Sequence, residues 1–349
     1  MNDNLVFDLK LKIAKALMFG LDVSQFINQL IEIENELGNN FKASRISSQF
    51  FDRQFLNNSE IDISISMIVK NESKTLQSTL ESIKNIADEI IIVDTGSTDN
   101  TIEIAKNYTD KIYHLDWAND FSFARNYSLD KCVGNWVMYI DADEVLTEQS
   151  AKQFRNTIKL AGDNDGLLIT KIINYGLDDN GKKIEYIGQY PRIFRNIGFP
   201  LVHFFGRIHE QIGPSLINFD YEMKNTNLEL IHSGYFRSKE EMNTKVKRNL
   251  QTLSDHIQED SSNGYTWYQL GNTLYQMQEY AKSIDILENA LKCNNMSDFL
   301  NSNTCLALSN AYYKIKNNNK AIEKAKESLK YNPKNQVAEI MLTNLLKLN

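Results

Sequence analysis

Three acidic residues follow an apolar run in the stretch VMYIDADEVL at residues 137–146. If this segment is extended, Asp141 and Asp143 point to the same side, with the small Ala142 between them. Carboxylate oxygens are the ligands that a hard divalent cation prefers. A single aspartate in such a position is often only part of a solvated turn or a helix cap. Three acids in four positions, including Glu144, favour a cation site.

Four short apolar segments lead up to these acids, at residues 61–69, 89–94, 111–117 and 135–143. Helical patterns or long loops separate them, with helical spacing of apolar residues at 72–85 and 100–107. Such alternation predicts a parallel, doubly wound α/β sheet with helices on both faces. Ligands of such sheets bind at the carboxyl ends of the strands. Asp94 and Asp141 both lie at predicted carboxyl ends, so we expect them to line one crevice.

Helical patterns flank this central region on both sides. Residues 1–58 contain apolar residues at spacings of three and four, which predicts helices with one apolar face each. This segment is too small for a good core of its own and should pack on the central region. We therefore expect a helical region at 1–58, an α/β domain at 59–240 and a helical domain at 241–349.

The C-terminal region contains an internal repeat. From about residue 262, two segments superpose with an offset of 38 residues, which pairs Leu270 with Leu308. The pattern resembles tetratricopeptide repeats, whose usual period is about 34 residues, with the extra residues near 295–298. Two repeats are few for a solenoid that stands alone. The region is either a concave surface for a partner or acceptor, or a brace for the central domain.

The composition excludes several classes of protein. The chain has 349 residues, 42% of them hydrophobic, and a formal net charge of -7. This acidic balance predicts no nucleic-acid partner and no general affinity for anionic membranes. The cysteines, Cys132, Cys293 and Cys305, lack a metal-binding spacing and suit a reducing compartment, so we expect the cytoplasm. Asp3 and Asp8 near the N-terminus and the lack of a long apolar segment predict neither a signal peptide nor a membrane span.

Five motifs occur in an order that resembles family 2 glycosyltransferases of the GT-A fold, over about residues 62–237: MIVKNESKTLQSTLESI, DEIIIVDTGSTDNTIEIAK, DFSFARNYSLDKCVGNWVMYIDADE, PRIFRN and GRIHEQI. The resemblance implies a GT-A doubly wound mixed sheet, a nucleotide-sugar donor and inversion at the anomeric carbon. With helices before this domain and tetratricopeptide repeats after it, the chain is similar to sublancin-type S-glycosyltransferases. Those enzymes modify bacteriocin precursor peptides, the glycocins, which implies a UDP-hexose donor and a peptide acceptor.

The acidic stretch matches the DxD motif of this family. By resemblance, Asp143 contacts a divalent metal, Mg²⁺ or Mn²⁺, and Asp141 contacts the ribose or a metal-bound water. A histidine from the later half of the domain often completes the metal shell in such enzymes. His232 in LIHSGY is the first candidate and His209 in RIHEQI the second. For either histidine, a packed or surface position is the alternative.

The resemblance also implies contacts to the donor nucleotide. Asp94 matches the uridine-contacting aspartate, and Ser97 in the same loop is either a second contact or a structural residue. Glu72 matches a position that reaches the nucleoside, although acids are also favoured in the first turn of a helix. Arg125 is a candidate for closing over the base or pyrophosphate. A surface ion pair to Asp120 is the alternative for Arg125.

Glu210 is the candidate general base or acceptor-orienting group, with His209 beside it. It is chosen because RIHEQI is the best acidic match in the later half of the domain. The sequence has no clear TED motif for a base and no clear QxxRW segment of the processive synthases. Arg192 and Arg195 in PRIFR either face phosphate or are solvated.

Three functions remain open. The first is glycosylation of a peptide, on cysteine or on serine or threonine; the second is transfer to a cell-envelope glycan or lipid carrier; the third is a non-catalytic scaffold. The intact Asp94, Asp141 and Asp143 count against the scaffold. The lack of a basic amphipathic helix counts against a lipid-linked acceptor. A homodimer stays open, because the sequence does not set the oligomeric state.

Overall fold

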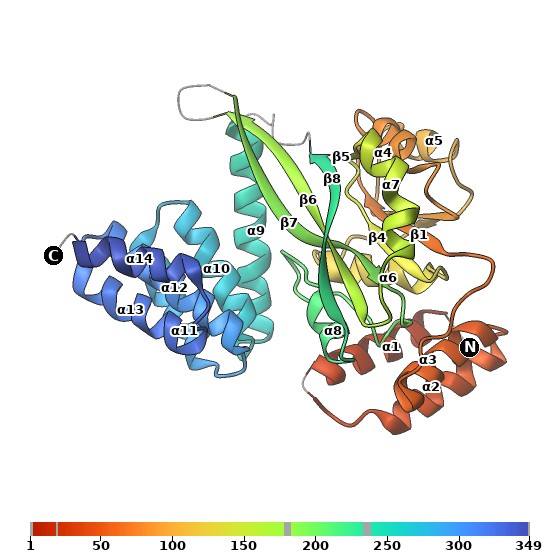
Figure 1. The fold of residues 1–349 in the computed structure, drawn as a ribbon, viewed down its shortest axis with the longest axis horizontal. Helices are drawn as coiled ribbons and strands as arrows, with labels where there is room; N and C mark the ends of the chain where they lie inside the picture. The colour runs from red at the N-terminus through yellow and green to blue at the C-terminus, as the bar shows by residue number, and fades with distance from the viewer. Residues whose placement is uncertain (1–2, 19, 178–182, 233–238, 348–349) are drawn as a thin grey trace. The chain divides into compact units, whose positions relative to one another are not determined.

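The computed structural model describes residues 3–18, 20–177, 183–232 and 239–347 (Figure 1). The chain divides into two compact units. One comprises Met1–Phe205 and Glu210–Arg237, and the other comprises Gly206–His209 and Ser238–Asn349. The first unit contains the sheet, and the second is built mainly from helices.

A mixed sheet forms the centre of the first unit (Figure 1). Its strands are β1 (Ile63–Val69), β2 (Glu89–Asp94), β3 (Ile112–His114), β4 (Trp136–Tyr139), β5 (Glu144–Leu146), β6 (Asp165–Leu177), β7 (Lys183–Arg195) and β8 (Glu222–His232). Their order is β3-β2-β1-β4-β7-β6-β8-β5. The first four strands pair in parallel, and β7 and β5 pair antiparallel to their neighbours. This arrangement confirms the predicted α/β class and its mixed sheet.

Helices cover both faces of this sheet because its strands are apolar on both sides. The helices of this part are α4 (Leu76–Ile83), α5 (Thr101–Ala105), α6 (Phe121–Lys131), α7 (Glu148–Lys159) and α8 (Gly213–Ile217). In β4, Trp136 and Met138 join the core that α4 and α7 complete. Val137 and Tyr139 join the opposite core, with α6 and α8. Alternate side chains of β4 therefore pack into two separate cores, one on each face of the sheet.

The N-terminal helices complete the second of these cores. They are α1 (Asp3–Met18), α2 (Ser24–Glu36) and α3 (Asn40–Asp52), and their apolar residues share a cluster with sheet residues. The buried Lys10 ammonium pairs with Glu34 and lies 2.6 Å from Oδ1 of Asp130 on α6. The Tyr221 hydroxyl donates to Oε1 of Gln49 at 3.0 Å. These helices therefore belong to the same compact unit as the sheet.

The strands β6, β7 and β8 were not predicted from the sequence. A register shift in the β6–β7 ladder lies between Leu168 and Ile169, and a second shift interrupts the β6–β8 ladder after Ile169. The burial of β6 side chains nevertheless alternates without interruption from Leu168 to Tyr175. The residue types do not follow this alternation, because Thr170 and Asn174 are buried while Ile169 and Ile173 are partly exposed, so the 13-residue strand shows no simple apolar–polar pattern.

The second unit repeats a pair of helices. Its helices are α9 (Lys239–Glu259), α10 (Gly264–Gln276), α11 (Tyr280–Lys292), α12 (Asp298–Lys314), α13 (Asn318–Tyr331) and α14 (Gln336–Lys347). The Ser283 hydroxyl donates to the Gly271 carbonyl at 2.8 Å in the first pair. At the equivalent positions of the second pair, the Ser309 hydroxyl donates to the Ala321 carbonyl at 2.8 Å. The predicted offset of 38 residues aligns Gly271 with Ser309 and Ser283 with Ala321, so the same pair of positions is hydrogen-bonded in both repeats. The donating serine is on the second helix of the first pair and on the first helix of the second pair.

The extra residues of the second repeat lengthen its first helix. The helix α12 has 17 residues and α10 has 13, and Ser297 caps α12 by accepting a hydrogen bond from the Leu300 amide. None of the helices in the described part of the chain is long and apolar enough to cross a bilayer.

Candidate active site

The loops after β1 and β2 are joined by hydrogen bonds. Asp94 ends β2, is buried, and accepts hydrogen bonds from the amides of Ser97 and Gly96 at 3.1 and 3.3 Å. Gly96 adopts φ +101°, which a side chain would disfavour. The Asn71 amide donates to the Ser97 hydroxyl at 2.9 Å, and the Thr98 amide donates to the Asn71 side chain at 2.7 Å. Asp94 and Ser97 are thus held in one rigid turn at the carboxyl end of the parallel strands.

Glu72 lies in the same pair of loops and has local partners. Its carboxylate accepts a hydrogen bond from the Thr75 hydroxyl at 3.0 Å, and its amide donates to the Thr101 hydroxyl at 2.8 Å. Asp99 accepts hydrogen bonds from the amides of Ser73 and Thr101 at 3.2 and 3.1 Å. Hydrogen bonds with Ser73 and Thr101 hold the pKa of Asp99 below its usual range. The backbone amide of Glu72 therefore helps to join the two loops, while its carboxylate bonds within its own loop.

The acidic stretch after β4 forms a closed turn. The Glu144 amide donates to the Asp141 carbonyl at 3.0 Å, and the Asp141 amide donates to Oε2 of Glu144 at 3.0 Å. The extended alternation expected for Asp141 and Asp143 is therefore wrong, because the backbone reverses direction between them. The two carboxylates consequently have different partners.

Two buried arginines hold the first of these carboxylates. Nη2 of Arg125 lies 2.5 Å from Oδ1 of Asp141, and Nη2 of Arg192 lies 3.1 Å from Oδ2. Arg192 also contacts Oε1 of Glu144 at 2.5 Å, and Nε of Arg125 donates to Oε1 of Glu210 at 2.7 Å. The structure thus brings together Arg125, Asp141 and Glu210, three residues singled out from the sequence.

Burial and charge set the protonation of this cluster. Burial alone would raise the pKa of Asp141, but the charges of Arg125 and Arg192 outweigh it and lower the pKa below its usual range. Burial raises the pKa of Glu144 to about 7, although Arg192 opposes this shift. Asp141 is therefore ionised near neutral pH, while burial makes the Glu144 carboxyl harder to ionise than an exposed glutamate.

An aromatic ring supports both arginines. The guanidinium carbons of Arg125 and Arg192 lie 4.8 and 4.6 Å from the centre of the Tyr139 ring. Phe204 packs edge-on against Tyr139 with ring centres 5.1 Å apart. Cation–π contacts of this kind favour the charged, planar guanidinium and fix its orientation. The last residue of β4 therefore positions the groups that bind Asp141.

Asp143 has a histidine partner instead. Nε2 of His232 lies 3.2 Å from Oδ2 of Asp143, and Nδ1 lies 3.0 Å from Oδ1 of Asn174. The Asn174 amide group donates to the carbonyls of Ile172 and Tyr186, at 3.1 and 3.4 Å. Its oxygen therefore faces His232, whose Nδ1 carries a proton. Burial lowers the pKa of His232, but the bond to Asp143 and nearby carboxylates outweigh it and raise the pKa.

The Asp143–His232 pair fits a divalent cation that takes most of its ligands from elsewhere. In the regions that the structure describes, no group of three or more His, Cys, Asp or Glu side chains is arranged to hold a metal. Asp141 is engaged by arginines, so a cation at this turn would have one carboxylate oxygen and one imidazole nitrogen as its candidate protein donors. Mg²⁺ commonly binds through one or two protein carboxylates together with phosphate oxygens and water. Such a donor set suits a cation that arrives with a diphosphate.

Two other predicted residues have different surroundings. His209 lies in the second compact unit, is exposed, and accepts a hydrogen bond from the Tyr265 hydroxyl at its carbonyl, 2.7 Å away. Arg195 donates to the carbonyls of Gly162 and Asp165 at 2.8 and 3.1 Å, which is a structural role. Sequence reasoning missed Asn174, whose only signal is a polar residue among the apolar residues of β6.

The chain is similar to several known proteins. Residues 64–209 match a family model described as Glycosyl transferase family 2. A TPR repeat-containing protein of Synechococcus elongatus is 29% identical over 228 residues, covering 64% of this chain and 54% of that protein. The SPbeta prophage-derived glycosyltransferase SunS of Bacillus subtilis is 27% identical over 246 residues, covering 68% of this chain and 54% of that protein.

A solved structure of S. aureus TarS in complex with UDP-GlcNAc also aligns with this chain. The alignment covers 77% of this chain and 91% of that chain, with 14% identity and a TM-score of 0.43. The chain spans about half the length of the two curated relatives, 54% in each case.

Proposed function

Since this chain contains a glycosyltransferase family 2 domain at residues 64–209, we propose that the protein is an inverting glycosyltransferase. It transfers a hexose from a UDP-linked donor to a peptide acceptor, on a cysteine. The main observation in support is that Asp141, after the parallel strand β4, forms ion pairs with both Arg125 and Arg192. Nucleotide ligands of α/β sheets bind at this edge.

The uridine part of the donor is assigned to the turn after β2. The Asp94 carboxylate can accept a hydrogen bond from an N–H of uracil, and the amides of Ser97 and Gly96 keep it oriented. His114 at the end of β3 lies 3.4 Å from Asp94, and its side chain is 72% exposed. This exposed ring offers a surface beside the carboxylate on which a base can stack.

The diphosphate is assigned to the neighbouring turn. Asp143 and His232 would hold a divalent cation there, and Asp141 would contact the ribose or a water bound to the cation. The cation would neutralise the charge that develops on the leaving diphosphate. Arg125 and Arg192 keep the Asp141 carboxylate ionised and fixed in position. Fixed groups of this kind cost little reorganisation during the reaction.

The acceptor step needs one bond to form and one to break. The acceptor sulfur attacks the anomeric carbon while the bond from that carbon to the diphosphate oxygen breaks, and the thiol proton passes to Glu210. The Arg125 contact at 2.7 Å orients the Glu210 carboxylate. A thiol with an ordinary pKa of about 8.5 is already a few per cent thiolate near neutral pH, so it demands less of a base than a hydroxyl does.

The test is transfer to a defined peptide. A cysteine-containing bacteriocin precursor is incubated with the enzyme, UDP-hexose and Mn²⁺ or Mg²⁺, and its intact mass is measured. We expect one added hexose that fragmentation locates on cysteine and that a Cys→Ala peptide does not receive. Addition only to serine or threonine would reject the S-linkage. Transfer to a cell-envelope glycan but not to peptide would reject the peptide acceptor, and no transfer to either, with no donor hydrolysis, would favour a scaffold.

A further inference from the structure

Glu210 lies at the base of a hairpin whose two ends belong to the first unit. The hairpin base consists of Phe204, Phe205, Glu210 and Gln211. The Phe205 amide donates to the Gln211 carbonyl at 3.0 Å, and the Gln211 amide donates to the Phe205 carbonyl at 2.9 Å. Glu210 directly precedes Gln211 in the chain. The position of the hairpin base therefore determines where the Glu210 carboxylate can lie.

Asn126 on α6 holds the first residue of the hairpin base. Its side-chain oxygen accepts a hydrogen bond from the Phe204 amide at 2.8 Å, and its side-chain nitrogen donates to the Phe204 carbonyl at 2.9 Å. Asn126 is 3% exposed and Phe204 is 2% exposed. Buried backbone groups are costly to leave without a partner, and these two bonds satisfy both groups of Phe204. Asn126 thus pairs with this residue as a neighbouring strand would.

The adjacent residue of the same helix holds the other end of the hairpin base. Nε of Arg125 donates to Oε1 of Glu210 at 2.7 Å, and the guanidinium carbon of Arg125 lies 5.9 Å from the centre of the Phe204 ring. Two consecutive residues of α6, Arg125 and Asn126, therefore hold both ends. A closed ring of hydrogen bonds leaves α6 at Asn126, passes through the hairpin base and returns to α6 at Arg125.

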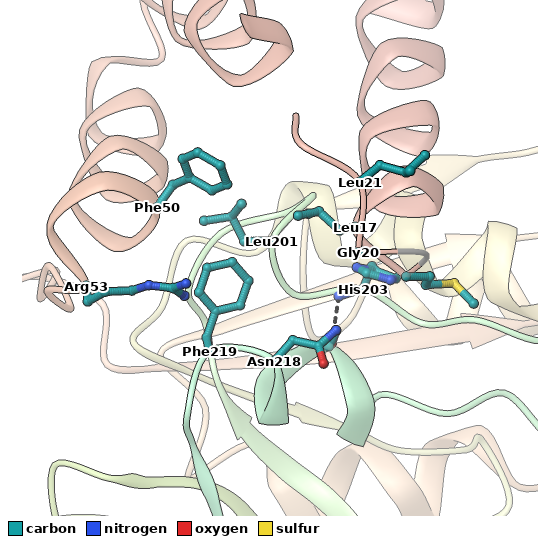
Figure 2. Close-up of a pocket in the computed structure, with 11 residues that line it drawn as sticks. Leu17, Gly20, Leu21, Phe50, Arg53, Leu201, His203, Asn218 and Phe219 are labelled. Carbon is teal, nitrogen blue, oxygen red and sulfur yellow. Dashed lines mark hydrogen bonds between the residues drawn. The ribbon is translucent and has the colours of Figure 1, made fainter. Parts of the chain in front are cut away.

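The residue before the hairpin base is held as well. The His203 amide donates to the Ser215 hydroxyl at 3.2 Å, and Figure 2 marks this bond with a dashed line. The Ser215 hydroxyl donates to the Ile212 carbonyl at 2.7 Å. Burial lowers the pKa of His203 to about 4, so its ring is neutral near pH 7 and places no charge in this core. The chain that enters the hairpin is therefore fixed before it reaches Asn126.

We propose that Asn126 is a positioning residue for Glu210. It holds the hairpin base where the Glu210 carboxylate meets Arg125, beside Asp141. This inference rests on the proposed function, in which Glu210 accepts the proton of the acceptor. Asparagine is a weak helix former, so its place in the middle of α6 is explained better by the hairpin than by the helix.

Asn126→Ala tests this role. Loss of both hydrogen bonds lets the hairpin base shift, and a misplacement of about 1 Å can cost about 10²-fold in rate. We expect the single-turnover rate of hexose transfer to the peptide to fall about 10- to 100-fold, with UDP affinity nearly unchanged. Asn126→Ser is a milder change, because its hydroxyl can reach Phe204 through a water. It should lose less, and it replaces the alanine variant if that protein does not fold.

Asn196→Ala is the matched control. Asn196 is 2% exposed, and its side-chain nitrogen donates to the carbonyls of Cys132 and Gly134 at 3.1 and 3.0 Å. It follows β7 at the amino end of β4, away from the acidic turn. The control should lose stability in urea, as Asn126→Ala does, but keep the rate of the parent. Equal losses of rate in the two variants would mean that general destabilisation lowers the rate, and would overturn the positioning role.

A double variant separates positioning from a purely structural role. Residues that act as a unit have non-additive effects on rate. If Asn126 acts through Glu210, Asn126→Ala should cost nothing further once Glu210→Gln has removed the base. A further loss of the same size in the Glu210→Gln background would contradict the proposal.

Hydrogen exchange at the Gln211 amide tests the placement without any substrate. This amide donates to the Phe205 carbonyl, so its protection reports local opening of the hairpin base. We expect faster exchange in Asn126→Ala and parent-like exchange in Asn196→Ala. Unchanged exchange in Asn126→Ala would show that Asn126 does not hold the hairpin.

These measurements distinguish the inference from the proposed function. If the parent transfers no hexose to any acceptor, the proposed function fails, and exchange at Gln211 still decides whether Asn126 holds the hairpin. If the parent is active and Asn126→Ala is equally active, the positioning role alone fails.

Discussion

Nε2 of His232 lies 3.2 Å from Oδ2 of Asp143, although 89 residues separate them in the chain. The antiparallel pairing of β5 with β8 explains this meeting, because His232 is directly opposite Glu144, the residue after Asp143. The turn after β4 and the last strand of the sheet therefore build the proposed cation site together. A defect in the register of β8 would separate its two donors.

Asp143→Asn tests the cation assignment. The amide keeps the shape but loses the negative charge, so we expect the fold to persist and metal-dependent binding of UDP to weaken. Loss of a residue that merely supports a metal ligand costs about 10- to 100-fold in affinity, and loss of the ligand itself should cost at least as much. Calorimetric titration with UDP and Mn²⁺ measures this.

Asp285→Asn is the matched control for that variant, because it removes an exposed carboxylate from α11 in the second unit. It should bind UDP and Mn²⁺ like the parent. Equal affinity and turnover for the Asp143 variant and the parent would contradict the cation assignment.

Asn174→Leu tests how His232 is positioned. The substitution removes the acceptor that fixes Nδ1 of the imidazole, so the ring can rotate away from Asp143. We expect the apparent affinity for Mn²⁺ to fall about 10- to 100-fold, with UDP affinity in the absence of metal unchanged. Manganese binding is followed by electron paramagnetic resonance. An Asn174→Asp variant keeps the acceptor, and Mn²⁺ affinity should be closer to that of the parent; equal losses in both variants would refute the positioning role.

Glu210→Gln separates the roles of base and donor contact. If Glu210 accepts the acceptor proton, turnover should fall by about 10²- to 10⁴-fold while the dissociation constant for the donor stays nearly the same. Single-turnover kinetics and donor titration give these two quantities. A loss seen only as weaker donor binding would mean that Glu210 acts through Arg125, its partner at 2.7 Å.

His203 should make the first unit less stable in acid. Its pKa is about 4 in the folded chain and about 6.5 when unfolded, so between these values only the unfolded state takes up the proton. Above pH 6.5, His203 therefore does not lower the free energy of unfolding. As the pH falls from 6.5 to 4, His203 lowers this free energy progressively, by on the order of 3 kcal/mol at pH 4.

Urea unfolding of the parent and of His203→Gln at pH 7, 6, 5 and 4 measures this contribution. The glutamine does not titrate, so the parent should lose stability relative to the variant as the pH falls. Parallel pH profiles for the two proteins would show that His203 is not the group responsible.

The sequence predicted the parallel half of the sheet well because the strands there are short and largely apolar, with turn residues or loops after them. It failed for β6, where polar residues such as Thr170 and Asn174 occupy buried positions, and for the turn at Asp141–Glu144, which was expected to be extended. The contacts between side chains in the site could not be predicted from the sequence either. Which carboxylate Arg125 or Arg192 would meet depends on strand pairing between distant segments, and no local pattern reports it.

The shared core of α1, α2 and α3 with the sheet has a consequence for synthesis. The hydrogen bond between Gln49 and Tyr221 joins residues 172 positions apart. At about 5–20 residues per second, the ribosome needs roughly 10–35 s to make the chain between them. During this time the apolar faces of the N-terminal helices lack some of the sheet residues against which they pack. The Lys10–Glu34 pair also lacks Asp130 until that residue has been synthesised. We therefore expect the nascent chain to depend on chaperones that bind exposed apolar surface until the last strands leave the ribosome.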